Sequence, residues 1–216
     1  MTTYRFSVLA YALVRMWRAW PVIVPVVVAN AALQALLVWR TPDVGEWLAI
    51  ILMGLASLAI FAISYGLVAA AALRVPDGHV GLPAAVDGLR AHAGRFALWA
   101  VALVVASILG LMLYTVPGLV VLAITPFVLL AVLDGRPNPL AANFHAMGER
   151  FWRWLATTLV TGVVVLLGTV LTGFTAFFVR NPAASLAAWL VSGLVLAWFI
   201  TAWALVYRST SLAARG

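Results

Sequence analysis

The chain has 216 residues, of which 66% are hydrophobic and only 9% are charged, and its mean hydropathy is +1.12. Soluble domains have roughly 45–50% apolar and about 25% charged residues, so this composition excludes an ordinary soluble protein. The chain has no cysteine, which excludes disulfides, thiolate metal sites and cysteine nucleophiles. Because a membrane-spanning helix needs ~20 apolar residues, the length allows about six spans. We expect a single integral membrane domain over residues 1–216.

Residues 1–20 predict an amphipathic helix that lies along the membrane surface. The residues of its apolar face recur at helical spacing: Phe6, Ala10, Leu13, Trp17 and Trp20. The apolar stretch 20–39 is the first predicted span. Its two prolines have different consequences, because Pro21 falls in the first turn of the helix whereas Pro25 is expected to kink it.

A short polar loop at 40–46 separates the first span from the second, which is predicted at 47–73. The breakers Pro, Asp-Gly and Gly then predict a turn at 74–81. A second amphipathic surface helix follows at 82–95.

The centre of the chain predicts a helical hairpin. Residues 96–116 are apolar and uncharged, and residues 118–135 form a second apolar stretch that contains a proline. Pro117 and Gly118 lie between them and predict the turn of the hairpin.

A third surface helix is predicted to begin at Asn138, because an asparagine N-cap followed by proline is a favoured helix start. This segment leads into a fifth predicted span at 155–179. A loop at 180–185 and a sixth span at 186–207 complete the bundle.

Matching apolar spacings in two of the surface helices suggest an internal repeat. The two sets are Leu82, Val86, Leu89, Ala93 and Phe96, and Leu140, Phe144, Met147, Phe151 and Trp154. The predicted units, each a surface helix with a helical hairpin, are 1–75, 76–135 and 136–216. The predicted fold class is therefore an all-α membrane bundle of about six transmembrane helices and three amphipathic surface helices.

The arginines predict the orientation of the bundle. Every basic residue is arginine, and eleven of the 13 lie on one predicted side, together with both termini and the surface helices. Only Arg40 and Arg180 lie on the other side. The positive-inside rule makes the first side cytoplasmic, so we expect a multi-pass protein of the bacterial inner membrane. We interpret the net charge of +7 as affinity for anionic lipid, not for nucleic acid.

The sequence offers few residues that could catalyse a reaction or bind an ion. Apart from Asp134 at the cytoplasmic end of the 118–135 stretch, no Asp, Glu, Arg or His falls inside a predicted span, where such groups mark ion paths and catalytic sites. Asp87, Asp134 and Glu149 lie on the cytoplasmic side and are expected to pair with arginines. We therefore predict no catalytic residues, no metal site and no cofactor. The candidate contacts to anionic lipids or to partner subunits are Arg15, Arg18, Arg90, Arg95, Arg150 and Arg153.

Asn30 and Gln34 form a candidate polar notch in the first span. They are four residues apart and so share one helix face. One interpretation is a notch that grips a substrate or a lipid headgroup. The interpretation we prefer is hydrogen bonding to a neighbouring helix.

Several short motifs within residues 82–165 occur together in a known group of membrane proteins. They are Gly94-Arg95-Phe96, Val116-Pro117-Gly118, Pro126-Phe127-Val128, Leu133-Asp134-Gly135, Ala142 and Gly148-Glu149-Arg150-Phe151. The chain thus resembles a broad bacterial group that includes the integral membrane domain of some glycerophosphodiester phosphodiesterases and related multipass proteins. The resemblance implies a helical membrane module. The 216 residues hold no phosphodiesterase domain, so that activity is not implied.

These features favour a non-enzymatic role as an accessory or structural subunit of a membrane complex, in contact with anionic lipids and other membrane subunits. The alternative is a transporter component, either a substrate-binding or a permease subunit of an energised transporter. An integral membrane enzyme that acts on lipid is a third hypothesis, disfavoured because the spans hold no general base for a Ser or Thr nucleophile.

Overall fold

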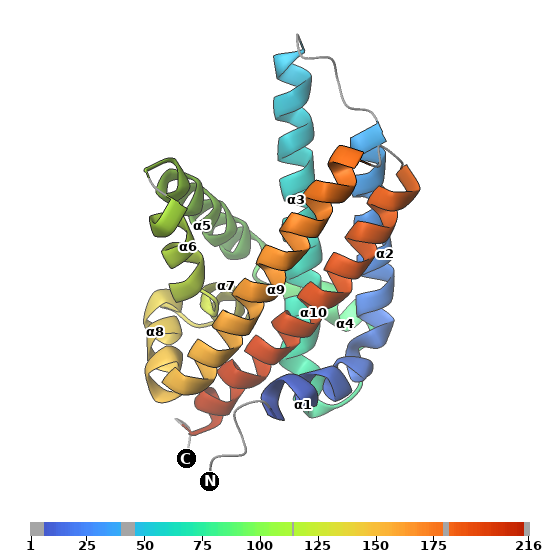
Figure 1. Ribbon diagram of the computed structural model, residues 1–216. Helices are drawn as coiled ribbons and strands as arrows, with labels where there is room; N and C mark the ends of the chain where they lie inside the picture. The colour runs from blue at the N-terminus through green and yellow to red at the C-terminus, as the bar shows by residue number, and fades with distance from the viewer. Residues whose placement is uncertain (1–6, 40–45, 114, 179–181, 214–216) are drawn as a thin grey trace.

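The computed structural model describes residues 7–39, 46–113, 115–178 and 182–213. Every regular element in these ranges is a helix (Figure 1), which confirms the predicted all-α class. The elements are α1 (Ser7–Met16), η1 (Trp17–Ala19), α2 (Trp20–Trp39), α3 (Trp47–Arg74), η2 (Val75–Asp77), α4 (Leu82–Arg90), α5 (Ala93–Leu113), α6 (Thr115–Ile124), α7 (Val128–Leu133), α8 (Pro139–Glu149), α9 (Phe151–Phe178) and α10 (Pro182–Ala213). The predictions made for Phe6, Arg40 and Arg180 fall outside these ranges.

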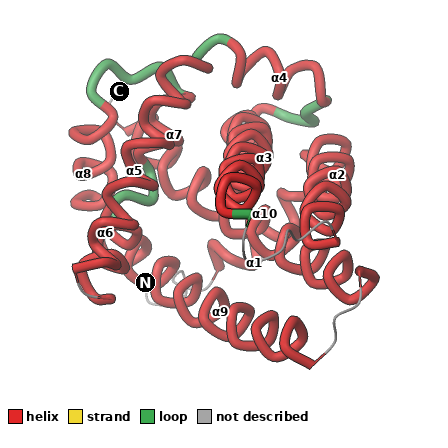
Figure 2. Tube along the Cα trace, turned by 90° about the horizontal axis from the view of Figure 1, so that it is seen from above, coloured by secondary structure: helices red, strands yellow, loops and turns green. Residues whose placement is uncertain are grey.

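The long helices α2, α3, α9 and α10 run side by side, and α10 packs against each of the other three (Figures 1 and 2). Within the described residues, four helical segments are long and apolar enough to cross a membrane. They are 8–37, 47–77, 93–110 and 183–209. The structure is therefore compatible with a membrane protein, and the count of six spans stays a prediction.

The short helices α1 and α8 lie at the end of the bundle where α10 ends, and α4 packs against α3 toward the same end (Figure 1). α1 crosses this end and is held by α10, since Trp198 Nε1 donates to the carbonyl of Leu9 at 2.8 Å. The chain then turns through η1 into α2. The amide of Val80 donates to the carbonyl of Arg18 at 3.0 Å and so fastens the 74–81 segment to this turn.

Burial is concentrated toward the same end of the bundle. On α3 the residues from Val68 to Leu73 are all buried, and on α10 so are Phe199 and Tyr207. Near the opposite end, large apolar side chains of α3 are exposed, with Trp47 at 69% and Leu55 at 57%. An apolar helix that is exposed in this way is compatible with a lipid environment rather than with water.

The apolar stretch 118–135 is two short helices, not the continuous span that its hydropathy predicts. α6 ends at Ile124 and α7 begins at Val128. Pro126 explains the break, because proline lacks an N–H, clashes with the preceding turn, and disfavours helical backbone at Thr125 before it. The predicted turn residue Pro117 lies inside the first turn of α6, where proline is tolerated.

α7 is a short helix set in the middle of the fold. It contacts α3, α5 and α8, and Val128, Leu130, Ala131 and Val132 are completely buried. The chain leaves it through Gly135, whose φ of +75° lies in the left-handed region that glycine adopts readily. α8 then begins as predicted, because the Asn138 side chain accepts a hydrogen bond from the amide of Ala141 at 3.0 Å.

Candidate functional site

The short helices turn small residues toward the bundle and large apolar residues away from it. The inward positions include Ala12 and Ala19 in the α1–η1 segment, Ala85 in α4 and Ala146 in α8, each at most 1% exposed. The exposed large residues include Leu13, Trp17, Leu82, Val86, Leu140 and Phe144. The apolar stripes seen in the sequence are therefore real, but much of each stripe faces outward. Small inward residues allow the close helix approach that packing requires.

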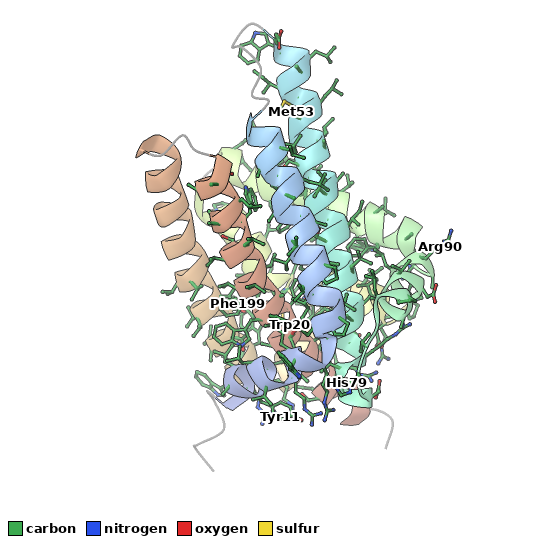
Figure 3. All side chains as sticks on the ribbon, turned by 90° about the vertical axis from the view of Figure 1, so that its right-hand side faces the viewer. Tyr11, Trp20, Met53, His79, Arg90 and Phe199 are labelled. Atoms are coloured by element: carbon green, nitrogen blue, oxygen red, sulfur yellow. The ribbon has the colours of Figure 1, made fainter. Side chains whose placement is uncertain are left out.

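Most of the candidate arginines lie beside these exposed apolar residues. Within the described part of the chain, Arg15, Arg18, Arg90, Arg150 and Arg153 form no ion pair. Arg90 points away from the bundle (Figure 3), whereas the other four are half-buried. Exposed apolar and aromatic side chains next to unpaired arginines are typical of helices that lie in a membrane interface.

Arg95 differs from the other five candidates. Its Nη2 donates to the carbonyl of Arg136 at 2.6 Å and to that of Pro137 at 3.2 Å. The first turn of α5 is thereby tied to the loop between α7 and α8. We conclude that Arg95 supports the fold, a role that only the tertiary structure reveals.

The predicted pairing of acidic residues with arginines holds in part. Asp134 accepts from Arg136 Nε at 3.0 Å and from the Tyr207 hydroxyl at 3.2 Å, which joins the end of α7 to α10. The pKa of the Arg136 guanidinium is raised, first by its hydrogen bond to Tyr207 and also by that to Asp134, so this group stays charged. Glu149 instead lies 3.0 Å from His145 Nε2. For Asp87, the described residues show no ion pair.

The buried Asn143 is the residue that sequence reasoning missed. It is 0% exposed and bridges the α6–α7 break. Its Oδ1 accepts from the amide of Phe127 at 3.0 Å, and its Nδ2 donates to the carbonyl of Ile124 at 2.7 Å. Thr125 Oγ1 donates to the carbonyl of Val121 at 2.7 Å, and Trp154 Nε1 donates to that of Ala123 at 3.2 Å.

Backbone groups at a helix break must find partners when water is absent. These side chains supply them, so the break is closed by α8 and α9. A polar residue among the apolar positions of a surface helix was the only sequence signal for Asn143.

Asn30 and Gln34, the two residues of the polar notch, both form hydrogen bonds with residues of α3. Ser57 Oγ donates to Gln34 Oε1 at 2.8 Å, and Gln34 Nε2 donates to the Ser57 carbonyl at 3.2 Å. Ser64 Oγ donates to Asn30 Oδ1 at 3.4 Å. Asn30 and Ser64 also line a cavity of about 60 Å³ between α2, α3 and α10, together with Tyr65 and others. That volume is about twice the ~30 Å³ that a water molecule occupies in the liquid.

The described residues contain no group of three or more His, Asp or Glu side chains that could hold a metal ion. Fold and site together define a class, which is an all-helical protein with several helices able to cross a membrane and with arginine-bearing short helices gathered toward one end. No family model matches the chain, and no curated protein or solved structure is similar enough to count as a match. The resemblance to the membrane domain of glycerophosphodiester phosphodiesterases therefore stays a prediction.

Proposed function

We propose that the chain is a non-enzymatic inner-membrane protein that acts as an accessory or structural subunit and contacts anionic lipids through α1, α4 and α8. One observation carries the proposal. The short helices expose large apolar and aromatic side chains, such as Trp17 at 66%, beside arginines that form no ion pair within the described residues. In water such a surface would be unfavourable, whereas at a bilayer both kinds of side chain find partners.

The lipid contact predicts a preference for anionic over zwitterionic lipid that depends on charge. Each arginine near an anionic surface contributes ~1 kcal/mol, so the double change Arg90→Gln and Arg150→Gln should weaken the local preference by roughly 2 kcal/mol. Tryptophan quenching by brominated phosphatidylglycerol and brominated phosphatidylcholine in reconstituted vesicles measures this preference.

The matched control is Arg90→Lys with Arg150→Lys, which keeps both charges and should keep the preference. The difference between the Gln and Lys variants should shrink at high salt, because salt screens exposed charges. A Gln variant with an unchanged preference would contradict the proposed lipid contact.

We further propose that the helices make six crossings, by α2, α3, α5, α6 with α7, α9 and α10, with both termini in the cytoplasm. The order of elements supports the threefold repeat, because each of the units 1–75, 76–135 and 136–216 has one short helix followed by helices that run away and back. The break between α6 and α7 in the second unit is the main departure from the repeated pattern.

The proposed topology predicts the outcome of reporter fusions. Fusions after Leu73, after Gly135 and at the C-terminus should all report the cytoplasm, because the arginine-rich segments are retained there. Fusions at Asp43 and Asn181 should report the opposite side. A C-terminus outside the cytoplasm would overturn the count of six.

A transporter component is the alternative, and the α6–α7 break favours it. Discontinuous helices surround the substrate in many transporters. Two observations weigh against it here: the backbone groups around the break are bonded by Asn143, Thr125 and Trp154, and the cavity beside Asn30 is only about 60 Å³. Ligand pockets usually measure roughly 300–1,000 Å³.

Copurification of partners in mild detergent distinguishes the accessory role from the transporter role. If the partner that copurifies is a membrane complex, the result supports the accessory role. If the partner is an ATPase, the result supports transport. Solute uptake by the reconstituted protein that is lost in a stably folded Asn30→Leu variant would place a substrate at the notch.

A further inference from the structure

The side-chain amide of Asn30 is only half used by the described part of the chain. Its Oδ1 accepts from Ser64 Oγ at 3.4 Å, whereas its Nδ2 donates to no described residue. The side chain is nevertheless buried, at 6% exposure. Gln34 on the same helix differs, because its Oε1 and its Nε2 both form hydrogen bonds with Ser57. The Asn30 amide therefore needs an acceptor that the described residues do not supply.

Asn30 lines the cavity between α2, α3 and α10, three helices that pack on one another (Figures 1 and 2). Other polar groups reach the same cavity, namely the Tyr65 hydroxyl from α3 and the Trp189 indole and Ser192 hydroxyl from α10. Among the described residues none of these three groups has a hydrogen-bond partner. The rest of the wall is apolar and includes Val27. Unbonded polar groups from three helices thus border one small space.

We infer that this cavity is a binding site for water and that one bound water accepts a hydrogen bond from Asn30 Nδ2. A volume of about 60 Å³ has room for about two water molecules. Internal waters typically bond about three otherwise unsatisfied polar groups. The Tyr65 and Ser192 hydroxyls both donate and accept, so with Asn30 they provide the partners that such a water requires.

The alternatives to water fit the cavity less well. An apolar occupant, such as the end of an acyl chain, would leave the Asn30 amide unsatisfied where no bulk water compensates for it. Collapse of the cavity is opposed by a contact beside it, because a Cβ on Gly193 would lie 2.8 Å from Val27 Cγ1. The helices α10 and α2 already touch there. The polar notch then holds solvent as part of the fold, an assignment that does not depend on the lipid contact proposed above.

Radiolytic footprinting of the full chain in non-ionic detergent tests the inference. A short X-ray pulse converts bound water into hydroxyl radicals, which oxidise the side chains next to it, and mass spectrometry locates the added oxygen. Tyr65 and Trp189 are the reporters because they line the cavity. Phe199 is the internal reference, since it is 0% exposed on the same helix as Trp189 and does not line the cavity. After correction for intrinsic reactivity, the reporters should be oxidised severalfold more than Phe199.

The deciding variant is Asn30→Leu, which keeps the branched shape of the side chain and removes the amide. The matched control is Gln34→Leu, which removes an amide from the same helix outside the cavity. Oxidation of Tyr65 and Trp189 should fall severalfold in Asn30→Leu and stay unchanged in Gln34→Leu. Equal oxidation in Asn30→Leu and in the unaltered chain would mean that the radicals come from bulk water, which overturns the inference.

Reporters oxidised no more than Phe199 in the unaltered chain would also overturn it, because the cavity would then be dry or filled by an organic molecule. Native mass spectrometry of the same sample would reveal such a molecule as added mass. The variant Tyr65→Phe decides the matter if Asn30→Leu does not fold, since it removes only a hydroxyl from the cavity. Oxidation of Trp189 should then decrease, and unchanged oxidation would overturn the inference.

Discussion

Replacing Asn143 by leucine is expected to destabilise the protein by roughly 2–6 kcal/mol, because a buried polar group left without a partner costs about 1–3 kcal/mol. The substitution leaves two such groups without a partner, because Asn143 forms hydrogen bonds with both the amide of Phe127 and the carbonyl of Ile124. Leucine has the same number of side-chain heavy atoms in the same branched arrangement, so the effect should come from the lost hydrogen bonds and not from a cavity. Denaturant-induced unfolding in mixed micelles measures the change.

Asn138→Ala is the matched control, because Asn138 is also a hydrogen-bonded asparagine and caps the same helix. Its side chain bonds a single amide, that of Ala141, at an exposed position. Loss of an N-cap costs about 1 kcal/mol. If Asn143→Leu were no less stable than Asn138→Ala, the α6–α7 break would not depend on Asn143.

Gly110→Ala is expected to destabilise the α5–α6 hairpin by about 1–3 kcal/mol, the usual cost of overpacking. A Cβ on Gly110 would lie 2.7 Å from the backbone nitrogen of Gly118 and 3.0 Å from the carbonyl carbon of Pro117. Both neighbours are backbone atoms and cannot rotate away, so the helices must move apart. Thermal unfolding in detergent measures the effect.

Two other glycines provide a graded comparison. A Cβ on Gly54 meets nothing within 4 Å, so Gly54→Ala should be neutral or stabilise α3 by up to about 1 kcal/mol through helix propensity. A Cβ on Gly193 would lie 2.8 Å from Cγ1 of Val27, a side-chain atom with some freedom to shift. Gly193→Ala should therefore fall between the other two. If Gly54→Ala and Gly110→Ala had equal effects on stability, α5 and α6 would pack less closely at Gly110 than the structure shows.

Where the outcome depended on local sequence, prediction succeeded. The second span was expected at 47–73 and α3 runs from Trp47 to Arg74. Asn138 was expected as an N-cap and bonds the amide of Ala141. Hydropathy and capping act within a few residues, so they can be read from a single segment.

Prediction failed where the answer depended on a distant residue. Residues 118–135 have the hydropathy of one span, yet they are divided at Pro126. A proline alone does not decide this, because Pro25 stays inside α2. The difference at Pro126 is that Asn143 and Trp154, far along the chain, take up the backbone groups that the break exposes.

The sequence by itself determined an all-helical chain of membrane-protein composition, the bounds of α2 and α3, the start of α8 and the set of candidate arginines. Only the tertiary structure decided which of these groups meet. It placed Arg95 on the α7–α8 loop, paired Gln34 with Ser57, and joined Asp134 to Tyr207. The physical reason is that apolar periodicity specifies that a helix has a buried side but leaves open which helix covers it. That choice depends on close packing of small residues and on hydrogen bonds between segments distant in sequence.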